Sequence, residues 1–352
     1  MSAAAVRILA AGPQVTIQDE GRDGHLQAGV TPAGPMDPLA FLLATRLAGS
    51  GPRAGAIEVS AGGLTIAAEG APLGLAIAGG QFKVVHEGRP MPGAVLLTLR
   101  PGETLSIRSG EAGSWCYVAF AGRIALPAVL GSVATHTRSG LGGLAGRALR
   151  AGDLVPIGPS GGAGPETARI VDASPARDGR EPDGTLIRVV PGPQDDYFAP
   201  DQMAAFLGTP WRLSARSDRM AYLMEGPALR HLKGFNIVSD GIPLGAIQVP
   251  GDGQPMVLMA DRQPTGGYPK IATVIRADIG RLAQTRPGGT VRFRAVTVAA
   301  AVEAWRIALA AIAAAGTVPL VRTDLSSEHL LAHNLVSGVT HGDEDASAGE
   351  RA

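Results

Sequence analysis

Polar side chains of several chemical types gather in residues 214–286, in a chain that is otherwise rich in Ala, Gly and Leu. The segment GAIQVPGDGQPMVLMADRQPTGGYPKIA, residues 245–272, alternates short apolar runs with turns that contain glycine and proline. Binding and catalytic groups commonly lie on loops that rigid strands hold, and successive glycines let backbone N–H groups converge on an anion. This region therefore predicts a site for a small molecule that carries a carboxylate or a phosphate.

Charged side chains in this region are the main candidates for chemistry. Arg216, Arg219 and Lys270 could neutralise a carboxylate or a phosphate, and an arginine can do so through two parallel hydrogen bonds. Asp252 and Asp261 could hold Mg²⁺, which prefers one or two carboxylates together with phosphate oxygens. The alternative is that Asp252 caps a hairpin and Asp261 forms a surface ion pair. Arg219, Asp261 and Lys270 are the candidate catalytic residues. We expect alanine at Arg219 or Lys270 to abolish turnover and to leave folding intact.

Neutral groups of the same region could bind a small molecule through hydrogen bonds. The side chains of Gln248, Gln263 and Tyr268 would orient an amide, and the backbone of Gly266 and Gly267 would bind an anion. The predicted binding set is Arg216, Gln248, Asp252, Gln263, Thr265, Gly266, Gly267 and Tyr268.

A second polar, glycine-rich loop spans residues 18–37 and reads QDEGRDGHLQAGVTPAGPMD. Its candidate site residues are Arg22, His25 and Asp37. A lone histidine in such a loop is more often solvated, and the turn before Asp37 could simply begin the next helix. These residues are therefore secondary candidates.

Several familiar kinds of site are excluded by the residues present. The chain has no G-x-x-x-x-G-K-[ST] phosphate loop, and its three lysines lack the methionine neighbours of a biotin carrier. Its seven histidines include one H-x-x-x-H pair, His329 and His333, and the others are scattered, so a zinc site is not expected. Residues 158–162 match G-x-S-x-G, but the AGPET that follows cannot open a packed helix, which favours a flexible linker. The single cysteine, Cys116, lies in an apolar run and is expected in the core.

Charge and hydropathy limit the possible partners and the compartment. The formal net charge is zero, so neither nucleic acid nor an anionic membrane is an expected partner. The first residues lack the basic and apolar regions of a signal peptide, which predicts a cytoplasmic protein. The longest apolar stretch, residues 298–318, is interrupted by Glu303 and Arg306 and is expected to form a surface helix rather than a membrane span.

The pattern of elements predicts a mainly β chain with two related antiparallel barrels, a few short helices and a C-terminal helix. Short strand-like runs recur from residue 56 to residue 121, and a helix with Asp37 as its N-cap and Pro38 at its first position is expected over 36–47. The expected organisation is a β-barrel half over 1–160, a linker over 161–185, a second barrel over 186–298, and a helix with a polar tail over 299–352.

Five motifs occur in an order that resembles one known family. They are QDEGRDG, TPAGPMD, SDRMAYLMEGP, the long segment 245–272 and LAQTRPGGTVRF. The chain resembles the family of the 5-oxoprolinase C subunit and allophanate hydrolase subunit 2, which also supplies half of the carboxyltransferase domain of urea carboxylase. The resemblance covers residues 15–293. It departs from the family at Asp240, where many relatives carry glutamate, and at Ala221, where glycine is common.

The resemblance implies the cyclophilin-like barrels and an enzyme that is active only in a complex. That complex would use ATP with Mg²⁺ to activate 5-oxoproline, together with a kinase-inhibitor-like B subunit and an A subunit that opens the lactam to glutamate. One alternative is a carboxyltransferase half that takes carboxyl from biotin carried on another protein. Another is a non-catalytic regulator that binds the kinase-inhibitor-like protein. The amidase that hydrolyses allophanate needs a Ser-Ser-Lys arrangement, and no lysine here lies in such a context.

Overall fold

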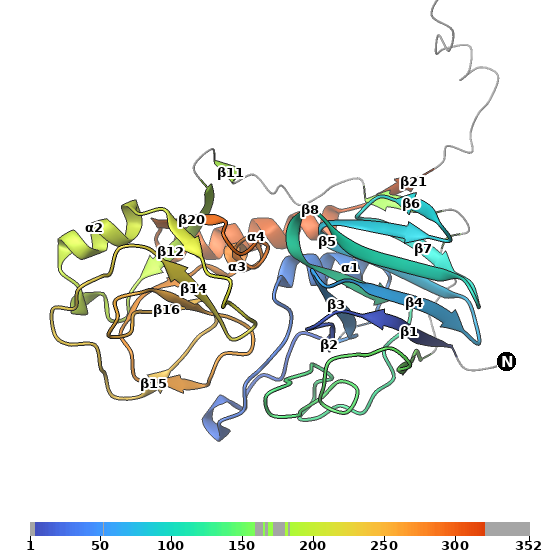
Figure 1. The fold of residues 1–352 in the computed structure, drawn as a ribbon, viewed down its shortest axis with the longest axis horizontal. Helices are drawn as coiled ribbons and strands as arrows, with labels where there is room; N and C mark the ends of the chain where they lie inside the picture. Colours follow the sequence, from blue (N-terminus) through green and yellow to red (C-terminus); the bar gives the residue numbers. More distant parts are fainter. Residues whose placement is uncertain are drawn as a thin grey trace, which may run out of the picture.

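The computed structural model describes residues 4–51, 53–158, 165, 168–171, 180–181 and 184–320. Most of the segment predicted as a linker, the G-x-S-x-G match beyond Gly158 and the polar tail after residue 320 lie outside the described residues. Two β-sheet units stand side by side, and a long helix runs along both of them (Figure 1). The prediction of a mainly β chain is confirmed.

The first unit is an eleven-stranded sheet with the order β21-β10-β7-β5-β8-β4-β1-β9, to which β2, β3 and β6 are added by side pairings. Its end strands β21 and β9 do not pair with each other in the described part of the chain. The strands are β1 (Ala5–Ala11), β2 (Thr16–Gln18), β3 (Ala56–Ser60), β4 (Leu64–Glu69), β5 (Leu73–His86), β6 (Arg89–Met91), β7 (Val95–Leu99), β8 (Thr104–Phe120), β9 (Leu154–Pro156), β10 (Arg169–Val171) and β21 (Thr317–Pro319).

The long strands β5 and β8 each join two short strand-like runs that the sequence predicts, 75–78 and 82–85 in β5, and 105–107 and 114–121 in β8. They pair along most of their length, and the register shifts between Gly79 and Gln81 and again before Lys83. Gly79 has a φ of +144°, and a Cβ atom there would lie 2.4 Å from the Cα of Cys116, so only glycine fits this bend. Cys116 is fully buried, as expected.

The second unit is a closed barrel of seven strands, which agrees with the predicted barrel fold. The order β12-β19-β16-β17-β14-β13-β20 returns to its start because β20 also pairs in parallel with β12. The short strand β11 extends the sheet, and a separate two-stranded ladder joins β15 to β18. The strands are β11 (Arg180–Glu181), β12 (Gly184–Pro191), β13 (Trp211–Leu213), β14 (Ala221–Glu225), β15 (Asp240–Gly241), β16 (Ala246–Gln248), β17 (Met256–Leu258), β18 (Thr265–Gly266), β19 (Lys270–Val274) and β20 (Thr290–Ala295).

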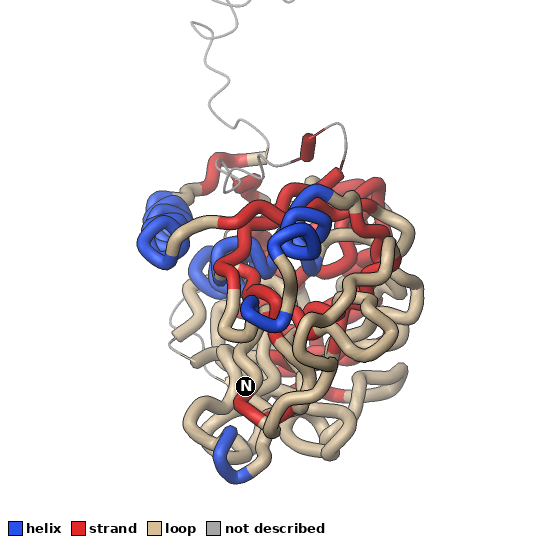
Figure 2. The backbone as a smooth tube through the Cα atoms, turned by 90° about the vertical axis from the view of Figure 1, so that its left-hand side faces the viewer, coloured by secondary structure: helices blue, strands red, loops and turns tan. Residues whose placement is uncertain are grey.

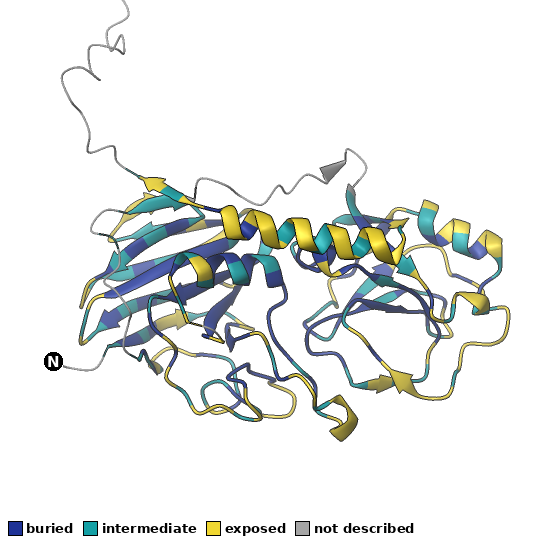
Figure 3. Ribbon diagram, turned by 180° about the vertical axis from the view of Figure 1, so that it is seen from behind, coloured by how far each residue is buried: buried dark blue, intermediate teal, exposed yellow. Residues whose placement is uncertain are grey.

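The described residues form four α-helices, which pack against the sheets (Figure 2). Helix α1 (Pro38–Leu47) begins as predicted, with the side chain of Asp37 accepting a hydrogen bond from the backbone of Ala40. Helix α4 (Val298–Ala314) contacts α1 in the first unit and α3 and β12 in the second, and most of its residues are exposed (Figure 3). No helix among the described residues is long and apolar enough to cross a membrane. The remaining helices are α2 (Pro200–Gly208), α3 (Arg276–Ala283) and the 3₁₀ turns η1 (Leu26–Ala28) and η2 (Asp195–Tyr197).

Specific polar contacts hold the two units together at α3. The side-chain oxygen of Gln284 accepts hydrogen bonds from the backbone of Ser114 (2.8 Å) and Trp115 (3.1 Å), and its nitrogen donates to Asp37 and to the Trp115 carbonyl. The indole of Trp115 donates to the hydroxyl of Tyr222 at 3.1 Å. These hydrogen bonds fix the position of the second unit relative to the first.

Candidate functional site

Arg219 lies at the junction of the two units and forms a buried network of ion pairs. Its Nε and Nη2 donate to the two carboxylate oxygens of Asp261 at 2.9 and 2.8 Å, and its Nη1 donates to Glu58. Nη2 also donates to the carbonyl of Gly34 at 2.8 Å. Only 5% of Arg219 is exposed, so this guanidinium is committed to protein partners from both units.

Glu58 is the residue of this network that sequence reasoning missed. It lies on β3 and is fully buried, and its Oε2 accepts hydrogen bonds from the backbone of Met36 and the hydroxyl of Tyr117, both at 2.8 Å. Burial raises the pKa of the Glu58 carboxyl, while the charge of Arg219 opposes that rise. Burial by itself lowers the pKa of Arg219, but the charges of Asp261 and Glu58 outweigh burial and raise it.

This geometry corrects one expectation about Arg219. Alanine at this position would leave the carboxylates of Glu58 and Asp261 buried without their shared cation, which is strongly destabilising. Folding is therefore not expected to stay intact in that variant. Any role of Arg219 or Asp261 in chemistry stays a prediction.

The mouth of the second barrel brings together several of the predicted residues. Lys270, at the start of β19, is 1% exposed, and its Nζ donates to the carboxylate of Asp240 at 2.7 Å. The side chain of Asp240 is 53% exposed, and the hydrogen bond from Lys270, followed by that from the backbone of Gly241, holds its pKa below the usual range. Asp240 pairs with Gly266 in the β15–β18 ladder, so the ladder lies directly over Lys270.

Two glutamines in this region carry acceptors that lack a donor. Gln248 is fully buried on β16, its register partner on β19 is Lys270, and its Nε2 donates to the carbonyl of Tyr268 at 3.3 Å. The Oε1 atoms of Gln248 and Gln263 are buried and meet no hydrogen-bond donor among the described residues. An unsatisfied buried acceptor costs roughly 1–3 kcal/mol, so each of these oxygens is suited to accept a hydrogen bond from a ligand.

Gly266 provides a test of the position of Gln248. A Cβ atom at this residue would lie 2.7 Å from Cδ1 of Ile242 and 2.8 Å from Nε2 of Gln248, both of which are ends of flexible side chains. We expect the unfolding free energy of G266A to stay within about 1 kcal/mol of the wild type, because both side chains can shift. Catalytic activity should fall by on the order of 10- to 100-fold, because Gln248 must leave its present position.

The matched control for G266A is G267A. A Cβ atom at Gly267 would meet only the carbonyl of Ile237, at 3.4 Å. Steady-state kinetics and urea denaturation of both variants check the prediction. Equal activity of the two variants would show that the position of Gln248 does not matter to the site.

The other predicted residues lie apart from the barrel mouth or at its edge. Tyr268 is 37% exposed and Thr265 is exposed on β18. Arg216 is exposed and lines a separate hollow of about 350 Å³ together with Arg212 and Glu225. Asp252 caps its turn by accepting from the backbone of Gln254 at 3.0 Å.

Asp252 and Asp261 precede and follow β17, respectively. Asp261 is buried and bound to Arg219, whereas Asp252 is exposed and caps its turn. The described residues contain no group of three or more His, Cys, Asp or Glu side chains arranged to hold a metal ion. Binding of Mg²⁺ by either aspartate stays a prediction.

The loop 18–37 holds the junction rather than an open site. Arg22 is 1% exposed and donates to the carbonyl of Ala134, and burial lowers its pKa. Asp37 caps α1 and accepts from Gln284 at 2.8 Å. His25 is half-buried before η1. Asp37 therefore contributes to the contacts between the two units, whereas the bond of Arg22 lies within the first unit.

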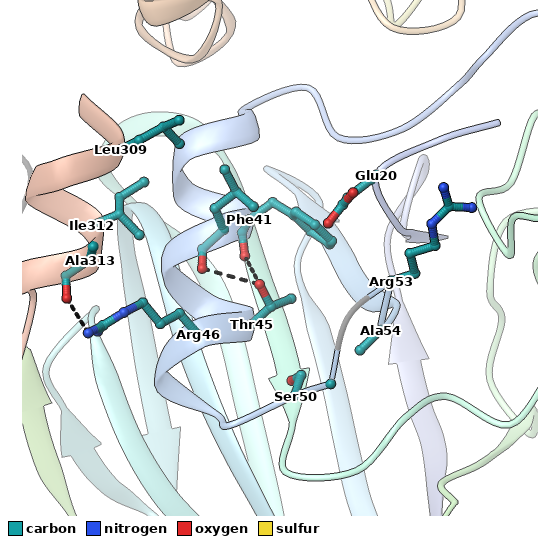
Figure 4. Close-up of a pocket in the computed structure, with 12 residues that line it drawn as sticks. Glu20, Phe41, Thr45, Arg46, Ser50, Arg53, Ala54, Leu309, Ile312 and Ala313 are labelled. Atoms are coloured by element: carbon teal, nitrogen blue, oxygen red, sulfur yellow. Dashed lines mark hydrogen bonds between the residues drawn. The ribbon is translucent and has the colours of Figure 1, made fainter. Parts of the chain in front are cut away.

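A cavity of about 420 Å³ lies between helices α1 and α4 (Figure 4). Phe41, Leu309 and Ile312 form its apolar wall, and Glu20 and Arg53 lie at its polar end. None of the predicted site residues lines this cavity, so the candidate site is placed at the barrel mouth.

Comparison with known proteins identifies the family of the chain. Residues 28–295 match the family described as carboxyltransferase domain, subdomain A and B. The chain is 35% identical to the C subunit of 5-oxoprolinase from Escherichia coli over 295 residues, which cover 82% of this chain and 90% of that protein. The similarity therefore extends over nearly the whole relative.

Solved structures show the same architecture inside longer chains. The urea amidolyase of K. lactis superposes with a TM-score of 0.82 at 25% identity, covering 89% of this chain but only 20% of that one. TTHA0988 superposes with a TM-score of 0.72 at 32% identity, and the match covers 82% of this chain and 55% of the TTHA0988 chain. The unit described here thus also occurs joined to further protein within one chain.

Proposed function

The chain belongs to the carboxyltransferase-domain family with subdomains A and B, and from this we propose that it is the C subunit of an ATP-dependent 5-oxoprolinase. The observation that carries the proposal is the 35% identity to a protein of that name over 90% of its length. The proposed complex is a cytoplasmic hydrolase that activates the lactam of 5-oxoproline with ATP and opens it to glutamate. This chain would be active only within the complex.

The barrel mouth supplies groups that suit this chemistry. A lactam N–H could donate to the unsatisfied Oε1 of Gln248 or Gln263, and the ammonium of Lys270 could neutralise a carboxylate or a transferring phosphoryl group. ATP with Mg²⁺ would bind at a site shared with a partner protein. The residues of this chain would then contribute positioning and charge, which are the main demands of phosphoryl transfer.

The proposed partners are a kinase-inhibitor-like protein, the B subunit, and a lactam-opening protein, the A subunit. The name of the Escherichia coli relative, which describes one subunit of an enzyme, supports a complex of more than one chain. We place ATP-dependent activation on this chain together with the kinase-inhibitor-like protein, and ring opening on the lactam-opening protein.

Reconstitution tests the proposed function directly. The purified chain, the kinase-inhibitor-like protein and the candidate lactam-opening protein are mixed, and ADP release is followed with and without 5-oxoproline. We expect release that requires 5-oxoproline and all three proteins. An assembled complex that releases no ADP in the presence of 5-oxoproline would rule the proposal out.

The similarity to urea amidolyase favours a second candidate function, transfer of a carboxyl group. In this case the chain would be half of a carboxyltransferase and would act on carboxybiotin carried by another protein. The chain spans only about a fifth of the K. lactis enzyme, so that enzyme's activity as a whole is not expected here. Transfer of ¹⁴C from a carboxylated biotin carrier to urea, with no response to 5-oxoproline, would identify this function.

A further inference from the structure

The loop between β14 and β15, residues 226–239, presents large apolar side chains to solvent. Val238 is 91% exposed, Leu232 is 66% exposed and Phe235 is 46% exposed. A single exposed apolar residue needs no explanation, but three within seven residues of one ordered loop are typical of an interaction surface. We call these three residues the patch. Figure 3 shows exposed residues along this loop and along the neighbouring β15–β18 ladder.

The loop is held in place by contacts along its length, so its exposed side chains are presented in a fixed arrangement. The backbone of Leu232 donates to the carbonyl of Tyr197 at 2.7 Å, and the ring of His231 lies 3.0 Å from the carbonyl of Val249 and packs on Phe198. The backbone of Ile237 donates to the carbonyl of Gly267 at 2.8 Å. A surface that is ordered before binding loses little entropy when a partner docks.

The patch continues directly into the candidate site. Val238 lies two residues before Asp240, the carboxylate that binds Lys270. Ile237 is bonded to the Gly266–Gly267 turn, and the exposed ring of Tyr268 follows that turn. A body that covers Val238 and Phe235 would therefore also cover the half-exposed Asp240, which binds the buried ammonium of Lys270.

We propose that the patch of Leu232, Phe235 and Val238 is the docking surface for the second protein of the ATP-activating pair, which closes the barrel mouth over Lys270. This inference rests on the proposed function. A protein is the expected occupant because the patch borders a site that is open at Asp240, and because relatives of this chain are a named subunit or part of a longer chain. The partner would present an apolar pocket for Val238 and Leu232 with polar groups beside it that reach the mouth.

Binding of the purified kinase-inhibitor-like protein to the full chain tests the docking surface. The variant L232D/V238D should fold normally, because both side chains are largely exposed. It should raise the dissociation constant at least about 30-fold, which is the loss of affinity expected for residues at the centre of an interface. The matched control is V302D, since Val302 is 63% exposed on α4, away from the mouth. Calorimetry measures both, and circular dichroism verifies folding.

A photo-reactive amino acid gives a second measurement, which does not depend on a loss of binding affinity. Benzoylphenylalanine in place of Val238 should crosslink to the kinase-inhibitor-like protein, whereas the same group in place of Val302 should not. The proposal is overturned if L232D/V238D binds like the wild type, if the crosslink joins two copies of this chain, or if the wild-type chain and that protein do not associate. Normal docking without ADP release would instead count against the proposed reaction and leave the docking surface standing.

Discussion

The R219A variant is expected to lose about 3–5 kcal/mol of unfolding free energy, which is a large fraction of the stability of a typical domain. The reason is that Glu58, which is 0% exposed, and Asp261, which is 5% exposed, would keep their charges in the interior without the cation that now binds both. Urea denaturation followed by tryptophan fluorescence measures the loss. The stability control is R216A three residues earlier, because Arg216 is exposed; that variant should stay within about 0.5 kcal/mol of the wild type.

The pH dependence of this loss identifies its cause. Removal of Arg219 removes a charge that lowers the pKa of Glu58, so the folded-state pKa of this buried carboxyl rises further above its unfolded value of roughly 4.3. A carboxyl whose pKa is higher in the folded state takes up a proton on folding, so the variant gains stability relative to the wild type as the pH falls.

The difference between R219A and the wild type should therefore be larger at pH 8 than at pH 5. The double variant E58Q/R219A should recover part of the loss at pH 8. A loss that is the same at both pH values and unchanged in the double variant would show that packing, not charge, is responsible.

The K270M variant is expected to lower 5-oxoproline-dependent ADP release by at least about 100-fold, the scale observed when one preorganised electrostatic group is removed from a site. Methionine retains an apolar side chain of similar length in the buried position, and Asp240 is exposed enough for water to solvate its carboxylate. We therefore expect its unfolding free energy to fall by less than about 1.5 kcal/mol.

The control for K270M uses another of the three lysines of the chain. Lys83 is exposed on β5 in the first unit, so K83M should retain full activity. Activity is measured in the assembled complex, and assembly is verified by gel filtration for each variant. Wild-type turnover by an assembled K270M complex would exclude the barrel mouth as the site of the chemistry.

Local patterns were sufficient to predict elements whose causes lie within a few residues. The Asp-Pro pair at 37–38 predicted the start of α1 because capping depends on neighbouring backbone groups. Helix α3 was missed because its eight residues, RADIGRLA, contain a glycine and several charges and show no long apolar stripe. Strands β5 and β8 were each expected as two short runs, because the continuity of a bent strand depends on the partner strand beside it.

The candidate site, too, could be predicted from local sequence only in part. The residue types and glycine turns of 245–272 by themselves indicated Gln248, Gly266 and Lys270, and the structure brings these three to one barrel mouth, since β16 and β19 are neighbours. The role of Arg219 was decided only by the tertiary structure. Glu58 is separated from it by 161 positions, and no local pattern shows that a distant carboxylate will be buried beside a cation. Because a buried charge without a partner is costly, folding commits Arg219 to Glu58 and Asp261. Lys270 is buried as well, but its partner Asp240 is half-exposed, and this difference in partners was also decided by the tertiary structure.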